Sequence, residues 1–432
     1  MPIPIAYWST RKSSAAIDAF LKRPAFDPAA EGVAATVLAD IRARGDAAVL
    51  AAAERFDGVV LKPSDMRLTA TQLAAASREV TPTVRRAVRE AHRRVTAFAK
   101  AGLRKDWQLT TRHGGRLGER FLPLDRVGVY IPGGAAPLAS TAIMTATLAK
   151  VASVREIVAC TPCGRDRSVN PVLLHALGVA GATEVYRVGG IQAIGLMAFG
   201  SQSVRPVQKI VGPGGAYVTA AKRQVYGHVA LDLVAGPSEI AILADKTAKP
   251  GWVAADLLSQ LEHGTGHEKA LLVTDSAELA QGVSDQLAWQ TPQLTRAGRI
   301  TPLLETGLLL VVVPTLDQGA ELCNRFAPEH LELMVARPRH FLPRLTAAGA
   351  IFVGHWTPES AGDFAAGPSH VLPTGGAARC FSGLTVEDFR RRTSVIEYAR
   401  NDLRDAREII ETFGAIEGLD AHARAGSIRF QA

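Results

Sequence analysis

The sequence predicts an α/β protein with two doubly wound, Rossmann-like parallel-sheet lobes, an N-terminal arm and a small helical C-terminal domain. Beyond the Gly-rich turn at residues 132–134, short apolar strands alternate with helical segments. The connections are long enough to hold a helix, as neighbouring parallel strands require. The alternation occurs in two runs, and 432 residues exceed one ordinary domain. We therefore expect two parallel sheets, each covered by helices on both faces.

The part of the chain before this alternation is predicted to be mainly helical. Residues 1–25 are expected to form an arm. Between residues 28 and 103, apolar residues recur at the helical spacing i, i+3, i+4, i+7. The first such set comprises Ala34, Val37, Leu38 and Ile41. Residues 107–131 change to a strand-like pattern, which leads into the alternating region.

The alternating region itself predicts eight strands and six helices. The strands are expected at residues 156–160, 184–188, 209–211, 240–244, 269–274, 307–313, 331–335 and 349–353. The helices are expected at residues 171–180, 191–199, 216–225, 251–262, 276–288 and 315–325. Each strand is short and rich in apolar residues, which is typical of strands buried on both faces of a parallel sheet.

The order of these elements predicts where the lobes begin and end. The first α/β lobe is expected to be discontinuous and to comprise residues 26–128 and 239–381. Residues 129–238 would form the second lobe between these two pieces. Residues 382–432 are polar and helical in pattern, so we expect them to form the small terminal domain.

Composition and charge exclude several classes of protein. The chain is 47% hydrophobic and 21% charged, which is typical of a globular protein. Its net charge of +8 is spread along the sequence without the signature of a nucleic-acid-binding module. The longest apolar run, residues 308–314, is much shorter than the ~20 residues that span a bilayer. The N-terminus lacks the features of a signal peptide. We therefore expect a cytoplasmic protein that binds neither nucleic acid nor membrane.

The four cysteines favour a structural role over redox or metal chemistry. Cys160 and Cys163 form a C-x-x-C motif, but a loop follows them instead of the helix that would lower a thiol pKa. A zinc site would need a second pair at matching spacing, whereas Cys323 and Cys380 are isolated. We expect Cys160 and Cys163 to form a structural, reduced pair.

Two Gly-rich turns stand where a nucleotide-binding fingerprint would be expected. The sequence lacks G-x-G-x-x-G but has Tyr130-Ile-Pro-Gly-Gly134 and Gly212-Pro-Gly-Gly215. The second turn lies between a predicted strand and a predicted helix, where free N–H groups favour a phosphate. A tight β–α turn that needs glycine for its backbone conformation explains the same residues. The pattern leaves both interpretations open.

Two segments place polar side chains where they can act together. Gln260 and His263 are three residues apart at the end of a predicted helix, so they share a face and both can bind a metal. Histidine is also favoured at helix C-termini without any ligand. Glu329 and His330 are adjacent before a predicted strand, where they can divide acid–base tasks or form an ordinary loop pair.

Two further segments add a carboxylate and a histidine. Asp363 precedes a long loop, residues 367–376, that is rich in Gly and Pro and also contains a histidine. Glu417 and His422 lie close together near the end of the chain. Taken together, the polar segments supply several histidines, an aspartate and a glutamine but no thiolate. This set suits a divalent metal such as zinc with an open coordination position.

In their order along the chain, these segments resemble the histidinol dehydrogenase family. The resemblance extends from about residue 25 to residue 430. The matching stretches are YIPGG (130–134), KIVGPG (209–214), AYVTAAKR (216–223), AGPSE (235–239), DLLSQ (256–260), EHG (262–264), APEHLEL (327–333), GDF (362–364), HVLPTGGAAR (370–379) and EGLDAHA (417–423).

The resemblance implies a role for individual residues. Glu329 and His330 match the acid–base pair of the family. One zinc ion per subunit would be held by Gln260, His263, Asp363 and His422. The substrate contacts would be Ser238, Gln260, His263, His330, Asp363, Glu417 and His422. The cofactor contacts would be Tyr130, Gln192 and Gly215.

The resemblance also implies a reaction and an assembly. The family carries out the four-electron, NAD-linked oxidation of L-histidinol to L-histidine through bound L-histidinal, in histidine biosynthesis. It forms homodimers with intertwined tails, in which the C-terminal domain of one chain completes the site of the other. One rival function is a paralogous zinc- and NAD-dependent dehydrogenase of another small amino alcohol or diol. A non-catalytic α/β binding protein is the rival from another class, and the complete set of ligands and bases argues against it.

Three departures from the family pattern concern the substrate and the cofactor. The family usually has Asn at the position of Gly215, where that side chain touches the cofactor. It also usually has Asn at the position of Ser369. The stretch at residues 135–140 differs from the usual sequence after the YIPGG turn. Such changes also occur in relatives that oxidise other alcohols, whereas the retained acid–base pair and tail residues favour the ordinary activity.

Overall fold

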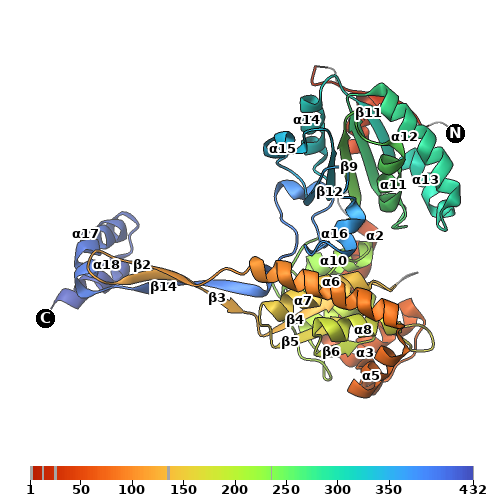
Figure 1. The fold of residues 1–432 in the computed structure, drawn as a ribbon. Coiled ribbons are helices and arrows are strands. Elements are labelled where there is room, and N and C mark those ends of the chain that lie inside the picture. Colours follow the sequence, from red (N-terminus) through yellow and green to blue (C-terminus); the bar gives the residue numbers. More distant parts are fainter. Residues whose placement is uncertain (1–2, 12–13, 24–26, 134–136, 235, 432) are drawn as a thin grey trace. The chain divides into compact units, whose positions relative to one another are not determined.

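In the computed structural model, the chain forms two compact units (Figure 1). The larger unit comprises Met1–Gly102 and Leu124–Phe389, and the smaller unit comprises Leu103–Pro123 and Arg390–Ala432. The structure describes residues 3–11, 14–23, 27–133, 137–234 and 236–431. Gly134 of the YIPGG turn and the residues at 135 and 136 therefore lie outside the described residues.

The larger unit contains a six-stranded parallel sheet, here called sheet A. Its strand order is β1-β11-β10-β9-β12-β13. The strands are β1 (Ile5–Tyr7), β9 (Glu239–Ala244), β10 (Lys269–Thr274), β11 (Leu308–Val312), β12 (His330–Met334) and β13 (Ala350–Val353). Without the edge strand β1, the strands follow the doubly wound order 3-2-1-4-5.

Helices cover both faces of sheet A because its side chains alternate between the faces. Ile240 and Ile242 of β9 pack in a core with the helices on one face, whereas Ala241 and Leu243 pack in a second core on the other face. The first core is closed by α11 (Pro250–Leu261), α12 (Ala277–Gln290) and α13 (Ala297–Thr306). The second is closed by α14 (Leu316–Phe326), which lies across the sheet from α11–α13 in Figure 1.

The larger unit also contains a five-stranded parallel sheet, here called sheet C. Its order is β6-β5-β4-β7-β8, which is again 3-2-1-4-5. The strands are β4 (Arg126–Tyr130), β5 (Glu156–Cys160), β6 (Glu184–Tyr186), β7 (Lys209–Val211) and β8 (Ala230–Leu231). The connecting helices are α7 (Ala139–Val151), α8 (Pro171–Ala180), α9 (Gly190–Phe199) and α10 (Ala216–Val225). The prediction of two doubly wound parallel lobes is confirmed.

The N-terminal third of the chain packs differently from the predicted arrangement. β1 pairs in parallel with β11, so residues of the expected arm form the edge of sheet A. The helices that follow are α1 (Ala15–Leu21), α2 (Pro28–Arg44), α3 (Asp46–Ala52), α4 (Pro63–Met66), α5 (Ala70–Glu79) and α6 (Pro82–Ala101). Leu38 and Ile41 of α2 enter the core beneath sheet C, although the sequence boundaries group residues 26–128 with the other lobe. An apolar stripe shows which face of a helix is buried but not which sheet it meets.

The smaller unit combines an antiparallel sheet with two helices. β2 (Trp107–Thr110), β3 (Arg116–Pro123) and β14 (Arg390–Glu397) form the sheet, in the order β14-β3-β2. The helices are α17 (Arg400–Ile416) and α18 (Asp420–Ser427). A helical pattern over residues 382–432 is therefore correct for α17 and α18 but wrong for β14. Most β14 side chains are exposed, so the strand shows no apolar alternation.

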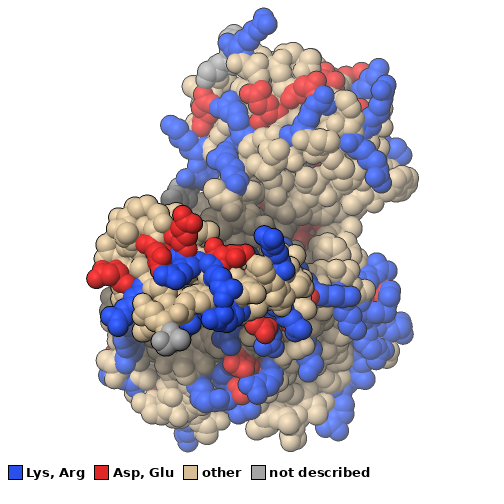
Figure 2. Space-filling view, turned by 90° about the vertical axis from the view of Figure 1, so that its left-hand side faces the viewer, with Lys and Arg blue, Asp and Glu red and all other residues tan. Residues whose placement is uncertain are grey.

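The surface charge and the helix lengths are relevant to nucleic-acid binding and to membrane insertion. On the face drawn in Figure 2, basic and acidic side chains are interspersed, without a large area of one sign. Among the described residues, every helix is too short or too polar to cross a membrane. The described cysteines are all free thiols, and Cys160 and Cys323 are buried.

Candidate active site

The candidate active site lies at the amino-terminal ends of two neighbouring strands of sheet A. β9 and β12 pair in parallel, with His330 opposite Ile240. Ser238 and Glu329 each immediately precede one of these strands, and His330 is the first residue of β12. Glu329 and His330 are both buried. The parallel pairing therefore brings residues that are far apart in sequence to the same edge of the sheet.

The C-terminal end of α11 supplies the second part of the site. Gln260 is fully buried, and its Oε1 lies 3.0 Å from Nδ1 of His330. Nδ1 of His263 lies 3.0 Å from the backbone oxygen of Gln260 and 3.3 Å from its side-chain nitrogen. In a crossover from β9 to β10, α11 runs back to the amino-terminal edge of the sheet, which is why its last turn meets the start of β12.

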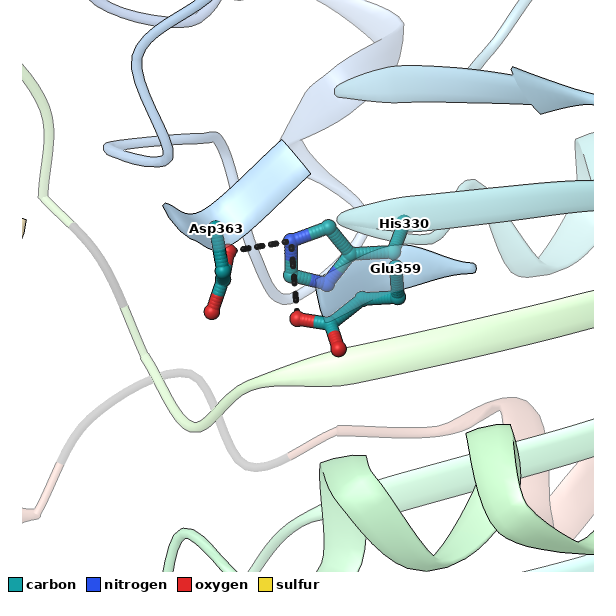
Figure 3. Close-up of side chains that lie close together, drawn as sticks. All are labelled: His330, Glu359 and Asp363. Atoms are coloured by element: carbon teal, nitrogen blue, oxygen red, sulfur yellow. Dashed lines mark ion pairs between the residues drawn. The ribbon is translucent and has the colours of Figure 1, made fainter. Parts of the chain in front are cut away.

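A short helix, α16 (Glu359–Phe364), supplies two carboxylates on one face. Nε2 of His330 lies 3.8 Å from Oδ1 of Asp363 and 4.0 Å from Oε1 of Glu359 (Figure 3). One ligand atom from each of these three residues lies within 4.8 Å of the others. Nε2 of His330 and Oε1 of Glu359 are buried, and neither has a hydrogen-bond partner among the described residues. Buried polar atoms are rarely left without a partner, so this cluster is suited to a ligand.

Burial determines the protonation of His330. Burial, with a smaller contribution from the nearby His263 and His370, lowers the pKa of the imidazole to about 3. The ring is therefore neutral near pH 7. Since Nδ1 faces the carbonyl-type oxygen of Gln260, Nδ1 carries the hydrogen and the lone pair lies on Nε2. His330 thus presents a free base to the space beside Glu359 and Asp363.

Burial also shifts the carboxyl groups around His330. It raises the pKa of Glu329 well above its usual range, although a hydrogen bond from the Glu239 N–H (3.1 Å) and the Ser238 side chain oppose the shift. It raises the pKa of Asp363 to about 6. Burial and the charge of Asp363 raise the pKa of Glu359 to about 8. These acids exchange protons much closer to neutrality than ordinary carboxyl groups do.

Two residues of the cluster had no role assigned from the sequence. Glu359 is four residues from Asp363 on one helix, a spacing that could have suggested it. His370 lies in the predicted site loop. Its Nδ1 is 3.8 Å from Oδ1 of Asp363, and its Nε2 is 3.2 Å from the Thr141 hydroxyl of α7. Burial lowers the pKa of His370 to about 4, so this ring is also neutral near pH 7.

The donor set fits a divalent cation of the zinc type. Imidazole nitrogen and carboxylate and amide oxygen are borderline-to-hard ligands, and no described thiol belongs to the cluster. Oε1 of Gln260 has a second lone pair besides the one directed at His330, so it can serve both partners. The structure brings Gln260, His263 and Asp363 together around His330. The other two residues predicted for the site, Glu417 and His422, lie in the smaller unit with exposed side chains.

The carboxyl-terminal edge of sheet C borders a second candidate site, a cleft of about 1180 Å³. The lining includes Tyr130, Gly133, Thr161, Gly190 and Gly215. The Tyr130 hydroxyl accepts a hydrogen bond from the Gly190 N–H (3.1 Å). The side-chain nitrogen of Gln192 donates to Oδ2 of Asp57 (2.8 Å). Of the residues predicted to contact the cofactor, Tyr130 and Gly215 therefore line this cleft. Gln192 is hydrogen-bonded to Asp57, which also lines it.

A buried ion pair stiffens the Gly-Pro-Gly-Gly turn at the cleft. The Gly212 N–H donates to Oδ2 of Asp232 (2.7 Å), and Nζ of Lys222 donates both to the Gly212 carbonyl (2.9 Å) and to Asp232. Gly212 has φ of 119°, and a Cβ there would lie 2.1 Å from the backbone carbonyl oxygen of Tyr130, so only glycine fits. Gly215 ends the turn as the N-cap of α10 and leaves the first N–H groups of that helix open to the cleft.

The Ser369 position has a structural role. Its hydroxyl donates to the Met144 carbonyl (3.2 Å) and accepts from the Val371 N–H (3.2 Å). The side chain is buried and both of its bonding directions are used. It therefore holds the loop that carries His370 against α7.

The fold and the buried cluster define an α/β enzyme with two Rossmann-like lobes and an acid–base site suited to a metal. The family model for histidinol dehydrogenase matches residues 22–430. The chain therefore belongs to the histidinol dehydrogenase family.

Individual relatives agree with this assignment. Histidinol dehydrogenases of Heliobacterium mobile and Moorella thermoacetica are 43% and 45% identical to the chain. The alignments cover 96% and 93% of this chain and 97% and 95% of those proteins. The crystal structure of histidinol dehydrogenase from Elizabethkingia anophelis superposes with a TM-score of 0.93 at 32% identity, covering 100% of this chain and 98% of that one.

Proposed function

We propose that the protein is a zinc-dependent histidinol dehydrogenase, which oxidises L-histidinol to L-histidine through bound L-histidinal with two NAD per turnover. The observation that carries the proposal is the buried, unpartnered Nε2 of His330, placed beside the carboxylates of Asp363 and Glu359. Membership of the family supports the choice of substrate and the place of the reaction in histidine biosynthesis.

Three of the expected metal ligands lie together in the larger unit, whereas the fourth lies in the smaller unit. Gln260, His263 and Asp363 would supply three ligands, and His422 of a second subunit would supply the fourth. When bound, zinc would polarise the alcohol oxygen as a Lewis acid and lower the pKa of the hydroxyl. Because Asp363 is the one anionic ligand of this set, the site keeps a net positive charge.

His330 and Glu329 would divide the proton transfers. The alcohol proton would pass to the free Nε2 of His330, whose ring is held by Gln260. Bound NAD would supply the hydride acceptor for each oxidation. In the second step Glu329 would remove a proton from the water that attacks the aldehyde, a task that suits a carboxyl group with a raised pKa. Ser238 would help to hold the substrate, and Glu417 would pair with its ammonium group.

NAD would occupy the cleft along sheet C. The N–H groups at the start of α10 and the positive end of its dipole favour a phosphate at the Gly212–Gly215 turn. Tyr130 and Gln192 would contact the cofactor at the end of β4 and at the start of α9.

A second copy of the chain would complete the site. Ile409, Phe413 and Ile416 recur on one face of α17 and are 62%, 58% and 73% exposed. Ile396 of β14 is 73% exposed as well. A cluster of this kind on a small unit indicates an interaction surface. We propose a homodimer in which the smaller unit of each chain binds the partner and contributes Glu417 and His422 to the partner's site.

The substrate is tested by assaying a panel of amino alcohols and diols for NADH production with the zinc-loaded protein. L-histidinol should have the highest kcat/KM of the panel. A clearly higher value for another amino alcohol or a diol would instead identify a paralogous dehydrogenase. No NADH from any alcohol would exclude a dehydrogenase of this type.

The glycine at the phosphate turn predicts a gain of function. A Cβ at Gly215 meets no atom within 4 Å, and asparagine is a favourable N-cap residue. Gly215→Asn should therefore tighten NAD binding by a few-fold, since one recovered hydrogen bond contributes about 0.5–1.5 kcal/mol. Isothermal titration with NAD measures the change. Gly298→Asn, at an exposed and equally open glycine in the first turn of α13, is the matched control and should leave the affinity unchanged. Unchanged or weaker binding by Gly215→Asn would show that the cofactor does not contact this turn.

A further inference from the structure

The topology of sheet C locates the place where a dinucleotide ribose should bind. In the order 3-2-1-4-5 the ligand crosses the carboxyl edge between the first and fourth strands, here β4 and β7. The adenosine half then lies over the second strand, here β5, where an acidic side chain commonly accepts the ribose hydroxyls. The usual glycine fingerprint is missing from this chain, so an acid that follows that fingerprint cannot be assumed.

Asp57 occupies this place, although it comes from outside the sheet. It ends the π-helical turn Ala53–Asp57 and lines the cleft. Its charge acts on Tyr130 at the end of β4 and on Cys163 just after β5. The carboxylate therefore lies at the carboxyl ends of the first and second strands, as the topology requires of a ribose-binding acid.

The carboxylate is held in position but not saturated. Oδ2 accepts a hydrogen bond from the side-chain nitrogen of Gln192 (2.8 Å), which fixes the group in the cleft. Among the described residues, Oδ1 has no hydrogen-bond partner. Burial raises the pKa of Asp57, and the hydrogen bond from Gln192 opposes this shift. The hydroxyl pair of a ribose would supply the missing donors.

We propose that Asp57 binds the adenosine ribose of the cofactor and makes the protein prefer NAD to NADP. A carboxylate accepts the ribose hydroxyls of NAD and repels the 2′-phosphate of NADP. The identity of the cofactor rests on the proposed function. Arg165 lies nearby, with its Nε 3.6 Å from the Cβ position of Gly58. Once the negative charge is removed, this guanidinium can attract a 2′-phosphate.

The variant Asp57→Asn tests the proposal by direct binding measurements on the full-length protein. Isothermal titration should show NAD binding weakened roughly tenfold, because a hydrogen bond to a charged group contributes ~1.5–3 kcal/mol. NADP binding should be unchanged or tighter, so the preference for NAD should fall by at least roughly tenfold. Glu54→Gln removes an exposed acid from the same helical turn and is the matched control. It should leave both affinities and the preference unchanged.

A cofactor analogue separates ribose recognition from a purely structural role. NAD that lacks the adenosine 2′-hydroxyl should bind the wild-type protein several-fold more weakly than NAD, whereas Asp57→Asn should bind both alike. If Asp57 merely orients Gln192, the variant should weaken NAD and NADP equally and should still respond to the missing hydroxyl. Either result would overturn the proposal.

Binding requires neither L-histidinol nor turnover, so the two proposals fail in different ways. A protein that selects NAD through Asp57 but does not oxidise L-histidinol would contradict the proposed function alone. Turnover of L-histidinol with an unchanged NAD preference in Asp57→Asn would contradict the ribose assignment alone. A wild-type protein that binds neither dinucleotide would refute both.

Discussion

Removal of the metal should abolish the oxidation of L-histidinol, and added zinc should restore it. His330 supplies a base, Glu359 and Asp363 supply carboxyl groups of raised pKa, and bound zinc would supply the positive charge that stabilises an alkoxide. A bound metal contributes several kcal/mol to such charge stabilisation. Since about 1.4 kcal/mol corresponds to a tenfold change in rate, chelation should reduce kcat by at least roughly a thousandfold.

The metal prediction can be tested with His263→Ala and controlled with His267→Ala, since both histidines lie in one segment of the chain. His263→Ala should lose zinc, measured by metal analysis, and should lose activity with it. His267 lies four residues further on, but α11 has already ended at Leu261, and Gly264 and Gly266 have positive φ, so the two histidines do not share a helix face. His267→Ala should therefore retain both zinc and activity. Full turnover by a sample verified to be free of metal would rule out the metal-dependent mechanism.

Mixed dimers should recover activity that neither parent variant has. His330→Ala removes the base in the larger unit, and His422→Ala removes the ligand in the smaller unit, so each homodimer should be nearly inactive. Each site of a dimer would combine the larger unit of one chain with the tail of the other chain. In a hybrid dimer, one site therefore carries both substitutions and the other site carries neither. Random pairing yields about half hybrids, so co-refolding should restore roughly a quarter of wild-type activity.

A second pairing controls for nonspecific effects of mixing. Glu329 and His330 both lie in the larger unit, so hybrids of Glu329→Gln and His330→Ala carry one lesion in every site. These hybrids should recover nothing. If His330→Ala and His422→Ala also recover nothing, although mass spectrometry of tagged chains shows hybrids, each site lies within one chain.

Local patterns predicted the elements of the two lobes well but not all of their packing. The strands at 156–160, 209–211 and 269–274 and the helices at 171–180 and 216–225 have the expected bounds, because apolar period and Gly or Pro boundaries are local signals. The sequence of α7 shows no helical period, because the helix is buried on nearly all sides, so no local pattern predicts it. β14 was missed because its pairing with β3 is non-local.

The site could be predicted in its parts but not in its geometry. The spacing of Gln260 and His263 alone predicts that their side chains lie close together. Their contact with His330 depends on the return of α11 to the amino-terminal edge of sheet A, where β12 begins, and no local pattern contains this arrangement. The pKa shifts of His330 and Glu329 arise from burial. Burial of a polar residue can be recognised only once the tertiary structure is known.

The ratio of NADH formed to L-histidinol consumed tests the proposed reaction most directly. His330 would take the alcohol proton, and Glu329, in the same buried site, would take a proton from the water that attacks the aldehyde. The zinc-loaded protein with excess NAD should therefore form two NADH and one L-histidine for each L-histidinol, without released aldehyde. A ratio of one, with free aldehyde in solution, would contradict the account.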